Sequence, residues 1–201
     1  ALATTRSLDD CVALLAQAQE RLGPGLTGFE VMNAFSLALV ARHMPQLRQP
    51  LAAAAWTVLL ELSDSEGEAH ARERFEGLLA DAIGDGRVDD AAVAASVAQS
   101  RAMWHLRESI PLAQAEEGLN IKHDISIPIS RIPAFVEQTD TLLQREIPGV
   151  RLVNFGHLGD GNLHYNVQAP EESDARVFLS EQEDRVNTLV FDSVARFGGS
   201  I

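Results

Sequence analysis

The stretch "NFGHLGDGNLHYNV", residues 154–167, places Asp-Gly between two extended arms, each of which carries a histidine. Asp-Gly is typical of a two-residue hairpin turn, because that turn needs positive φ at both central positions. Such a turn at 160–161 pairs His157 directly with His164 and points both side chains to one face. Strand alternation adds Asn166 to this face and turns the apolar residues between them to the other.

Two imidazoles on neighbouring strands can hold one divalent ion, since zinc binds imidazole nitrogen at about 2.0–2.1 Å. Surface hairpins also carry histidine pairs without an ion, and two histidines are an incomplete ligand set. From the residues alone, a metal site at His157 and His164 and an ordinary hairpin both stay open.

A second polar face is predicted on "NIKHDISIPI", residues 120–129, where Lys122 and Asp124 alternate with isoleucines. Arg107 lies fifteen residues before this lysine, near the end of an expected helix. An arginine and a lysine that converge on one site suit a carboxylate, because arginine binds it through two hydrogen bonds and lysine adds charge. Cations at helix ends are also common without any binding role.

Composition limits the classes of function. Of the 201 residues, 46% are hydrophobic, which is enough to bury a core. The net charge of −13 repels nucleic acid. No apolar run reaches the roughly 18 residues that a membrane span needs. Cys11 is the single cysteine, and we expect a cytoplasmic protein. The chain starts without Met and ends inside an expected turn, so we also expect a fragment cut at both ends.

Helical and extended patterns alternate twice along the chain, which predicts an α+β fold with two halves, 1–115 and 116–201, each with helices on one face of its strands. Ser7 and Ser130 are the expected caps of two helices, and Pro111 is expected to break another. The predicted helices cover 8–22, 33–43, 66–82, 92–110, 130–143 and 173–196. The predicted strands cover 26–32, 54–62, a short stretch near 88, 120–129, 149–155 and 162–167.

Three motifs, "LRESIP" at 106–111, "KHDISIPISRIPAFV" at 122–136 and "GHLGDGNLHYNV" at 156–167, resemble the C-terminal domain of FAD-linked oxidases of the vanillyl-alcohol oxidase type. Within that group the chain is most similar to the D-lactate, glycolate and D-2-hydroxyglutarate dehydrogenases. The resemblance implies a cap domain with two ferredoxin-like halves and an antiparallel sheet. It also implies an N-terminal domain of the same chain that binds FAD.

The resemblance assigns roles to five residues. It implies that His157 and His164 ligate a divalent metal, Zn, Fe or Mn. It further implies that Arg107 and Lys122 bind the carboxylate of a small 2-hydroxy acid, and that Asn166 contacts the substrate.

The resemblance also points to residues that the chain lacks. A threonine that assists the arginine in some members is replaced here by Pro111, which leaves the choice of 2-hydroxy acid open. The family's third metal ligand and its base are expected beyond Ile201, so no catalytic residue is assigned within the chain and the fragment is expected to be inactive. The electron acceptor is not indicated, and a homodimer is compatible with the pattern.

Two other functions are considered. A metal-dependent hydrolase can use the His157 and His164 pair with Asp160 or Asp124, although the turn chemistry of Asp-Gly explains Asp160 better. A non-catalytic interaction module can also contain every predicted element.

Overall fold

A computed structural model describes all residues from 1 to 201. The first half of the chain alternates strands and helices. Ser7 accepts a hydrogen bond from the Asp10 N–H and caps the first long helix, as its sequence predicts. The elements are β1 (Leu2–Thr5), α1 (Leu8–Leu22), β2 (Leu26–Asn33), α2 (Ala34–His43), β3 (Trp56–Leu62), α3 (Glu68–Gly84) and β4 (Asp90–Ala92). A short 3-10 turn, Gly23–Gly25, joins α1 to β2.

Two helices, α4 (Val97–Glu108) and α5 (Ile110–Glu117), lead into the second half. Its elements are β5 (Asn120–Ile121), β6 (Asp124–Ser126), η2 (Ile129–Arg131), α6 (Ile132–Glu146), β7 (Arg151–His157), η3 (Leu158–Asp160), β8 (Asn162–Gln168) and α7 (Ala175–Arg196).

All strands form one antiparallel sheet with the order β4-β1-β3-β2-β7-β8-β5, and β6 also pairs with β8. The first four strands have the order 4-1-3-2, and their succession is the β-α-β-β-α-β of a ferredoxin-like unit with α2 inserted between β2 and β3. The second half repeats it with β6, α6, β7, β8 and α7, and an antiparallel bridge from Ser126 to Ser200 lies beyond β6. The pairing of β2 with β7 joins the halves at the centre of the sheet.

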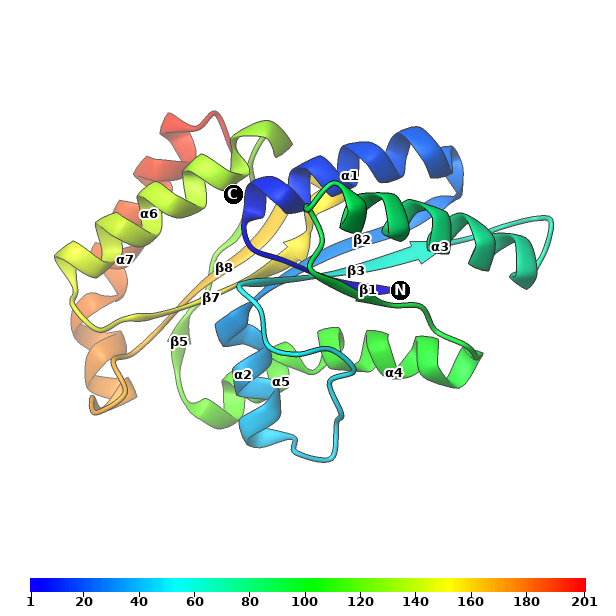
Figure 1. The fold of residues 1–201 in the computed structure, drawn as a ribbon. Helices are drawn as coiled ribbons and strands as arrows, with labels where there is room; N and C mark the ends of the chain where they lie inside the picture. Colours follow the sequence, from blue (N-terminus) through cyan, green and yellow to red (C-terminus); the bar gives the residue numbers. More distant parts are fainter.

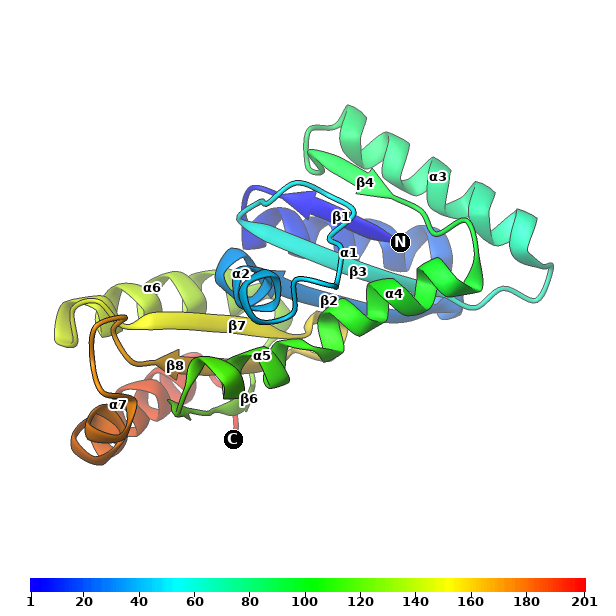
Figure 2. The same ribbon diagram turned by 90° about the horizontal axis from the view of Figure 1, so that it is seen from below.

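Helices cover both faces of the sheet, as Figures 1 and 2 show. The α+β class with an antiparallel sheet is confirmed. The predicted layer of helices on one face corresponds to α1, α3, α6 and α7. The structure adds α2, α4 and α5 on the other face. The second layer forms because the central strands bury apolar side chains on both sides: Phe29 and Val31 face the first layer, whereas Met32 faces the second.

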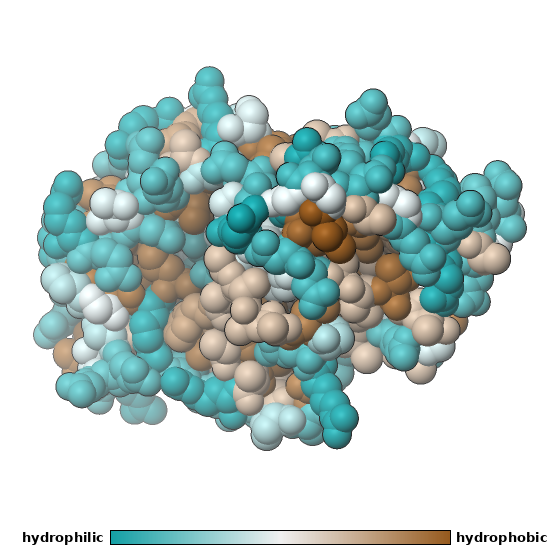
Figure 3. All heavy atoms as spheres, viewed as in Figure 1, coloured by the Kyte–Doolittle hydropathy of each residue, from teal (hydrophilic) through white to brown (hydrophobic).

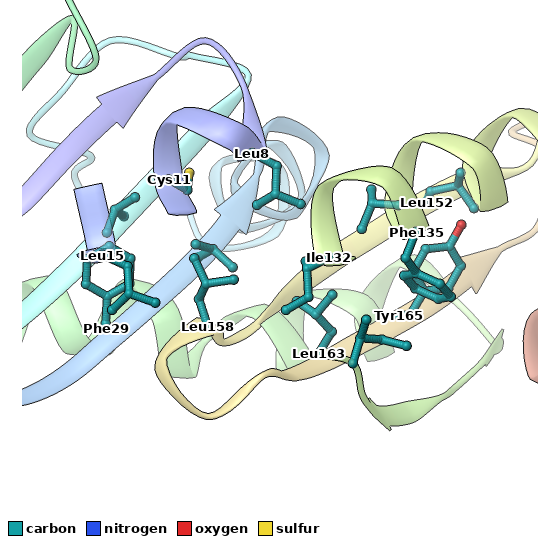
Figure 4. Packing of buried hydrophobic residues seen from close by; sticks show 14 of the residues in the cluster. Leu8, Cys11, Leu15, Phe29, Ile132, Phe135, Leu152, Leu158, Leu163 and Tyr165 are labelled. Carbon is teal, nitrogen blue, oxygen red and sulfur yellow. The ribbon is translucent and has the colours of Figure 1, made fainter. Parts of the chain in front are cut away.

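The larger hydrophobic core lies under α1, α3, α6 and α7, and Figure 4 shows the part of it under α1 and α6. Leu15 of α1 and Phe29 of β2 lie together at one end, and Phe135 of α6 lies beside Tyr165 of β8 at the other. The Phe135 and Tyr165 rings meet edge to face with centroids 5.5 Å apart. One continuous core therefore stabilises both halves.

The turn between β7 and β8 differs from the two-residue hairpin that the sequence predicts. Phe155 pairs with His164, so the predicted direct pairing of His157 with His164 is wrong by two residues. A 3-10 turn, η3, takes up the extra length. Among residues 158–161, only Gly161 has positive φ. Leu158 is fully buried in the larger core, which favours a longer turn that reaches inward.

Two other local predictions were wrong. The strand expected over 120–129 is interrupted between β5 and β6, where the backbone N–H of His123 donates to the Asn166 side chain. Ser130 does not cap α6, because Arg131 occupies the cap position and the preceding residues form η2. The break expected at Pro111 is confirmed: α4 ends at Glu108, and Pro111 lies in the first turn of α5, where its missing N–H leaves no hydrogen bond unmade.

No helix combines the length and the apolar composition that a bilayer crossing demands. Polar residues cover most of the face seen in Figure 3, and a paler, weakly hydrophobic area lies over α2 and the loop that follows it.

Candidate functional site

A row of polar side chains crosses the centre of the sheet on the face that α4 covers. Glu30 of β2 lies directly opposite His157 of β7, and one step along the sheet Phe155 lies opposite His164 of β8. His164 in turn lies opposite Asp124 of β6. Residues two apart on a strand share a face, so the register places both histidines on the same side of the sheet, on a diagonal.

His157 is held through one ring nitrogen. Its Nδ1 contacts Oε1 of Glu30, and its side chain is half exposed. Glu30 is only 1% exposed, so this carboxylate is taken from water and needs partners. The contact leaves Nε2 as the nitrogen through which His157 can bind a ligand.

Arg107 supplies the second partner of that carboxylate. It lies in the last turn of α4 and donates from Nε to Oε2 of Glu30 at 2.8 Å. Its guanidinium carbon lies 4.6 Å from the centre of the Phe155 ring, a cation–π contact. The residue is 7% exposed, and its two Nη groups have no hydrogen-bond partner in the protein. The side chain is 9% exposed, and these two groups are its unused donors.

His164 packs against the same Phe155 ring. The two ring centroids are 4.7 Å apart, and His164 Nδ1 lies 3.6 Å from Oδ1 of Asp124. Burial lowers the pKa of His164; Asp124 opposes this shift, whereas Arg107 and His157 add to it. The lowered pKa favours the neutral imidazole, the form that binds metal ions.

The two remaining predicted residues lie away from this cluster. Asn166 is buried on the same face as His164, but its side chain donates to Gln114 at 3.0 Å and accepts from the His123 N–H at 3.2 Å. Lys122 is exposed between β5 and β6 and forms no ion pair. The structure therefore brings together Arg107, His157 and His164 and leaves Lys122 and Asn166 further along the sheet.

Glu30 was missed by the sequence analysis. The signal was present, since "LTGFEVM" contains one carboxylate inside an otherwise apolar strand. A charged residue buried in a central strand requires a partner, and its partners come from 77 and 127 residues away along the chain. Only the fold identifies them.

A cavity of about 350 Å³ opens beside His157. Glu30, Trp104 of α4 and Asp160 contribute to its wall. Gly28 allows Trp104 to lie against β2, because a Cβ at this position would be 3.2 Å from the indole ring. The cavity gives a small polar molecule access to the exposed part of His157.

The donor set fits half of a metal site. Each histidine turns Nδ1 toward a carboxylate, which is the arrangement that usually fixes the tautomer of a metal-binding histidine. No group of three or more His, Cys, Asp or Glu side chains is placed to hold an ion by itself. The residues of this chain can therefore offer two imidazole nitrogens but not a complete coordination sphere.

Two ferredoxin-like halves share one sheet, with a buried cation and two imidazoles at the joint, which defines a domain of the α+β class. The model of the family "FAD linked oxidases, C-terminal domain" matches residues 1–201, and the chain belongs to this family.

Several curated relatives are similar over most of the chain. The mitochondrial D-2-hydroxyglutarate dehydrogenase of Arabidopsis thaliana is 32% identical over 192 residues, which cover 95% of this chain and 33% of that protein. The D-2-hydroxyglutarate dehydrogenase of Stutzerimonas stutzeri (strain A1501) is 32% identical over 200 residues, 98% of this chain and 41% of that protein. The chain thus spans about a third to two fifths of these relatives.

One solved structure shares the fold. A crystal structure of alkyldihydroxyacetonephosphate synthase superposes with a TM-score of 0.59 and covers 100% of this chain and 40% of that one. The sequence identity is 10%, so this likeness concerns the fold alone.

Proposed function

We propose that this chain is the substrate-side domain of an FAD-dependent dehydrogenase that oxidises a D-2-hydroxy acid, with D-2-hydroxyglutarate as the first candidate. One observation carries the proposal: Arg107 has unpaired Nη groups on the same face of the sheet as His157 and His164. The names of the relatives support the choice of substrate among D-lactate, glycolate and D-2-hydroxyglutarate.

Arg107 is the proposed anchor for the substrate carboxylate. Its Nε already serves Glu30, so the two Nη groups are free to donate in parallel to two carboxylate oxygens. Lys122 is exposed and can approach as a second cation. Asn166 keeps one amide hydrogen beyond the one donated to Gln114, and we assign this hydrogen to the substrate.

The proposed metal site uses Nε2 of His157 and Nε2 of His164, with Zn, Fe or Mn as candidates. A bound divalent cation would lower the cost of negative charge on the substrate hydroxyl oxygen. The two histidines fix where that oxygen lies relative to Arg107, because all three side chains are on rigid elements of one sheet and its covering helix.

FAD, when bound, would accept the hydride from the α-carbon, and the hydroxyl proton would pass to a base that is not among the residues assigned in this chain. This chain orients the substrate: Arg107 fixes the carboxylate, and the histidines fix the hydroxyl. Two fixed groups on adjacent carbons determine which way the α-hydrogen points. We therefore propose that the 201-residue chain without a flavin-binding domain catalyses no oxidation. The single buried Cys11 supports, as a further proposal, a location in the reducing cytoplasm.

The test of the activity uses the full-length protein with an artificial dye as electron acceptor. D-2-Hydroxyglutarate, D-lactate, glycolate and L-2-hydroxyglutarate are compared as substrates. The proposal requires turnover with at least one of the first three and a strong preference over the L-enantiomer. Turnover with none of the three contradicts it.

Metal titration separates this proposal from the two alternatives. The isolated chain and the full-length protein are titrated with Zn²⁺ and Mn²⁺, and His157→Ala is the comparison. The dehydrogenase proposal predicts weak binding by the isolated chain, tight binding by the full-length protein, and loss of both in the variant. A hydrolase requires tight binding by the isolated chain, and an interaction module requires none.

A further inference from the structure

Glu30 is the one carboxylate that contacts two of the proposed site residues at once. Its Oε2 accepts from Arg107 Nε at 2.8 Å, and its Oε1 contacts His157 Nδ1. The side chain is almost completely buried, so its orientation is fixed by these two partners and by the strand. A rotation of this carboxylate moves both partners together.

The contact with Nε decides how Arg107 can bind a carboxylate. A guanidinium offers two edges to a carboxylate: one formed by Nε and an Nη, and one formed by the two Nη groups. Glu30 occupies Nε, so the edge formed by the two Nη groups remains. Stacking on Phe155 fixes the plane of that edge. The substrate carboxylate is therefore directed to one position in line with the end of the side chain.

The contact with Nδ1 decides how His157 can bind a metal. An imidazole that donates from Nδ1 to a carboxylate presents an unprotonated Nε2, and the carboxylate also increases the basicity of the ring. His157 is half exposed, so without the Glu30 contact its ring would be free to change its tautomer and its rotamer.

We propose that Glu30 is a positioning residue that couples the carboxylate anchor Arg107 to the metal-binding His157, so that the distance between bound carboxylate and bound hydroxyl is set by one buried side chain. This inference rests on the proposed function. It assigns to Glu30 a role in substrate and metal binding, in addition to the effect that a buried ion pair has on the stability of the fold.

Glu117 provides a matched control within the same chain. Its side chain is also only 7% exposed and is held by arginine and histidine partners: it contacts Arg151, accepts from Arg42 Nη1 at 3.1 Å, and accepts from His43 Nε2 at 2.6 Å. Arg151 and His157 are the first and last residues of β7, so the two ion-pair clusters lie at opposite ends of that strand.

The experiment compares Glu30→Gln with Glu117→Gln in the full-length protein. A glutamine has one acceptor oxygen and one amide donor, so Glu30→Gln cannot offer a separate acceptor oxygen to each of Arg107 Nε and His157 Nδ1. Three quantities are measured: the KM for D-2-hydroxyglutarate, the Zn²⁺ affinity by competition with a coloured chelator, and the Tm. We expect Glu30→Gln to raise KM and weaken Zn²⁺ binding by about 10- to 100-fold each. Glu117→Gln should lower only the Tm.

Equal effects of the two variants on KM and on Zn²⁺ affinity overturn the inference. If Glu30→Gln does not fold, Glu30→Asp is measured instead: it keeps the charge but is too short to reach both partners, so both shifts are again required. If the wild-type protein oxidises no 2-hydroxy acid, the proposed function has failed, whereas the Zn²⁺ comparison still decides whether Glu30 positions His157.

Discussion

Phe155 and His164 face each other across β7 and β8, with ring centroids 4.7 Å apart. The same phenyl ring lies under the guanidinium of Arg107. One buried aromatic side chain thus orients both a cation and an imidazole of the candidate site. This relationship exists because the β7–β8 turn is two residues longer than Asp-Gly alone suggests.

Replacing Phe155 by leucine tests this support. The substitution keeps an apolar side chain in a buried position but removes the ring face, so we expect a loss of about 1–2 kcal/mol in the free energy of unfolding. The KM for the hydroxy acid should rise as well, because Arg107 loses its platform. Phe135→Leu, in the core on the opposite face, should cost similar stability without changing KM. Urea unfolding and steady-state kinetics measure both; an unchanged KM in Phe155→Leu would show that the ring has no orienting role.

Gly161 tests the turn itself. It has φ of +74°, and a Cβ there would be 2.5 Å from the Ile127 carbonyl oxygen. Gly161→Ala should therefore lower the free energy of unfolding by at least about 2 kcal/mol, the sum of a left-handed backbone and a clash with main chain. Gly77 lies inside α3 with open space around it, so Gly77→Ala should raise stability by about 0.5–1 kcal/mol. Thermal melts of the two variants should shift in opposite directions.

The sequence predicted the long helices well because their caps and apolar stripes are local. Ser7 and the apolar face of α1 are within one segment, and the structure confirms both. The β7–β8 register was predicted wrongly because Leu158, in the turn, is drawn into a core built by distant helices. A turn's own residues do not reveal how much burial the rest of the fold offers.

The candidate site shows the same difference between local features, which the sequence predicts, and contacts between distant segments, which it does not. Alternation along β8 correctly predicted that His164 and Asn166 share a face, and this requires no knowledge of other strands. Glu30 was missed because its role depends on β2 lying next to β7, a pairing between the two halves. Nothing local in "LTGFEVM" specifies that neighbour.

Asp140 gives the protein a pH-dependent stability. Burial raises the pKa of this carboxyl from 3.8 to about 6, although hydrogen bonds from Tyr165 and Asn154 oppose the shift. A raised pKa means that the folded state favours the protonated acid, so its contribution to stability is present below about pH 4 and is lost as the pH rises through 6.

Asp140→Asn should remove this dependence, because asparagine is neutral at every pH and keeps an acceptor for the Tyr165 hydroxyl. The variant should be more stable than the wild type at pH 7, by at most about 3 kcal/mol, and nearly equal to it at pH 4. Chemical unfolding at both pH values measures the difference. A variant that is less stable than the wild type at pH 7 would contradict the assignment.

Cys11 should be unreactive in the folded protein. Burial raises the pKa of its thiol to about 12, and the thiolate is the reactive form. An aromatic disulfide reagent at pH 8 should therefore label the thiol only as fast as the protein unfolds. Rapid labelling without denaturant would show that this part of α1 opens.

The most direct measurement of the proposed function is an anaerobic titration of the full-length flavoprotein with D-2-hydroxyglutarate, followed by loss of the oxidised-flavin absorbance. Wild type and Arg107→Lys are compared, because lysine keeps the charge beside Glu30 but loses the paired Nη donors. We predict complete reduction of the wild-type flavin and a half-saturating concentration about tenfold or more higher in the variant, as for the loss of one hydrogen bond to a charged group. A wild-type flavin that stays oxidised, or a variant that titrates like the wild type, contradicts the account.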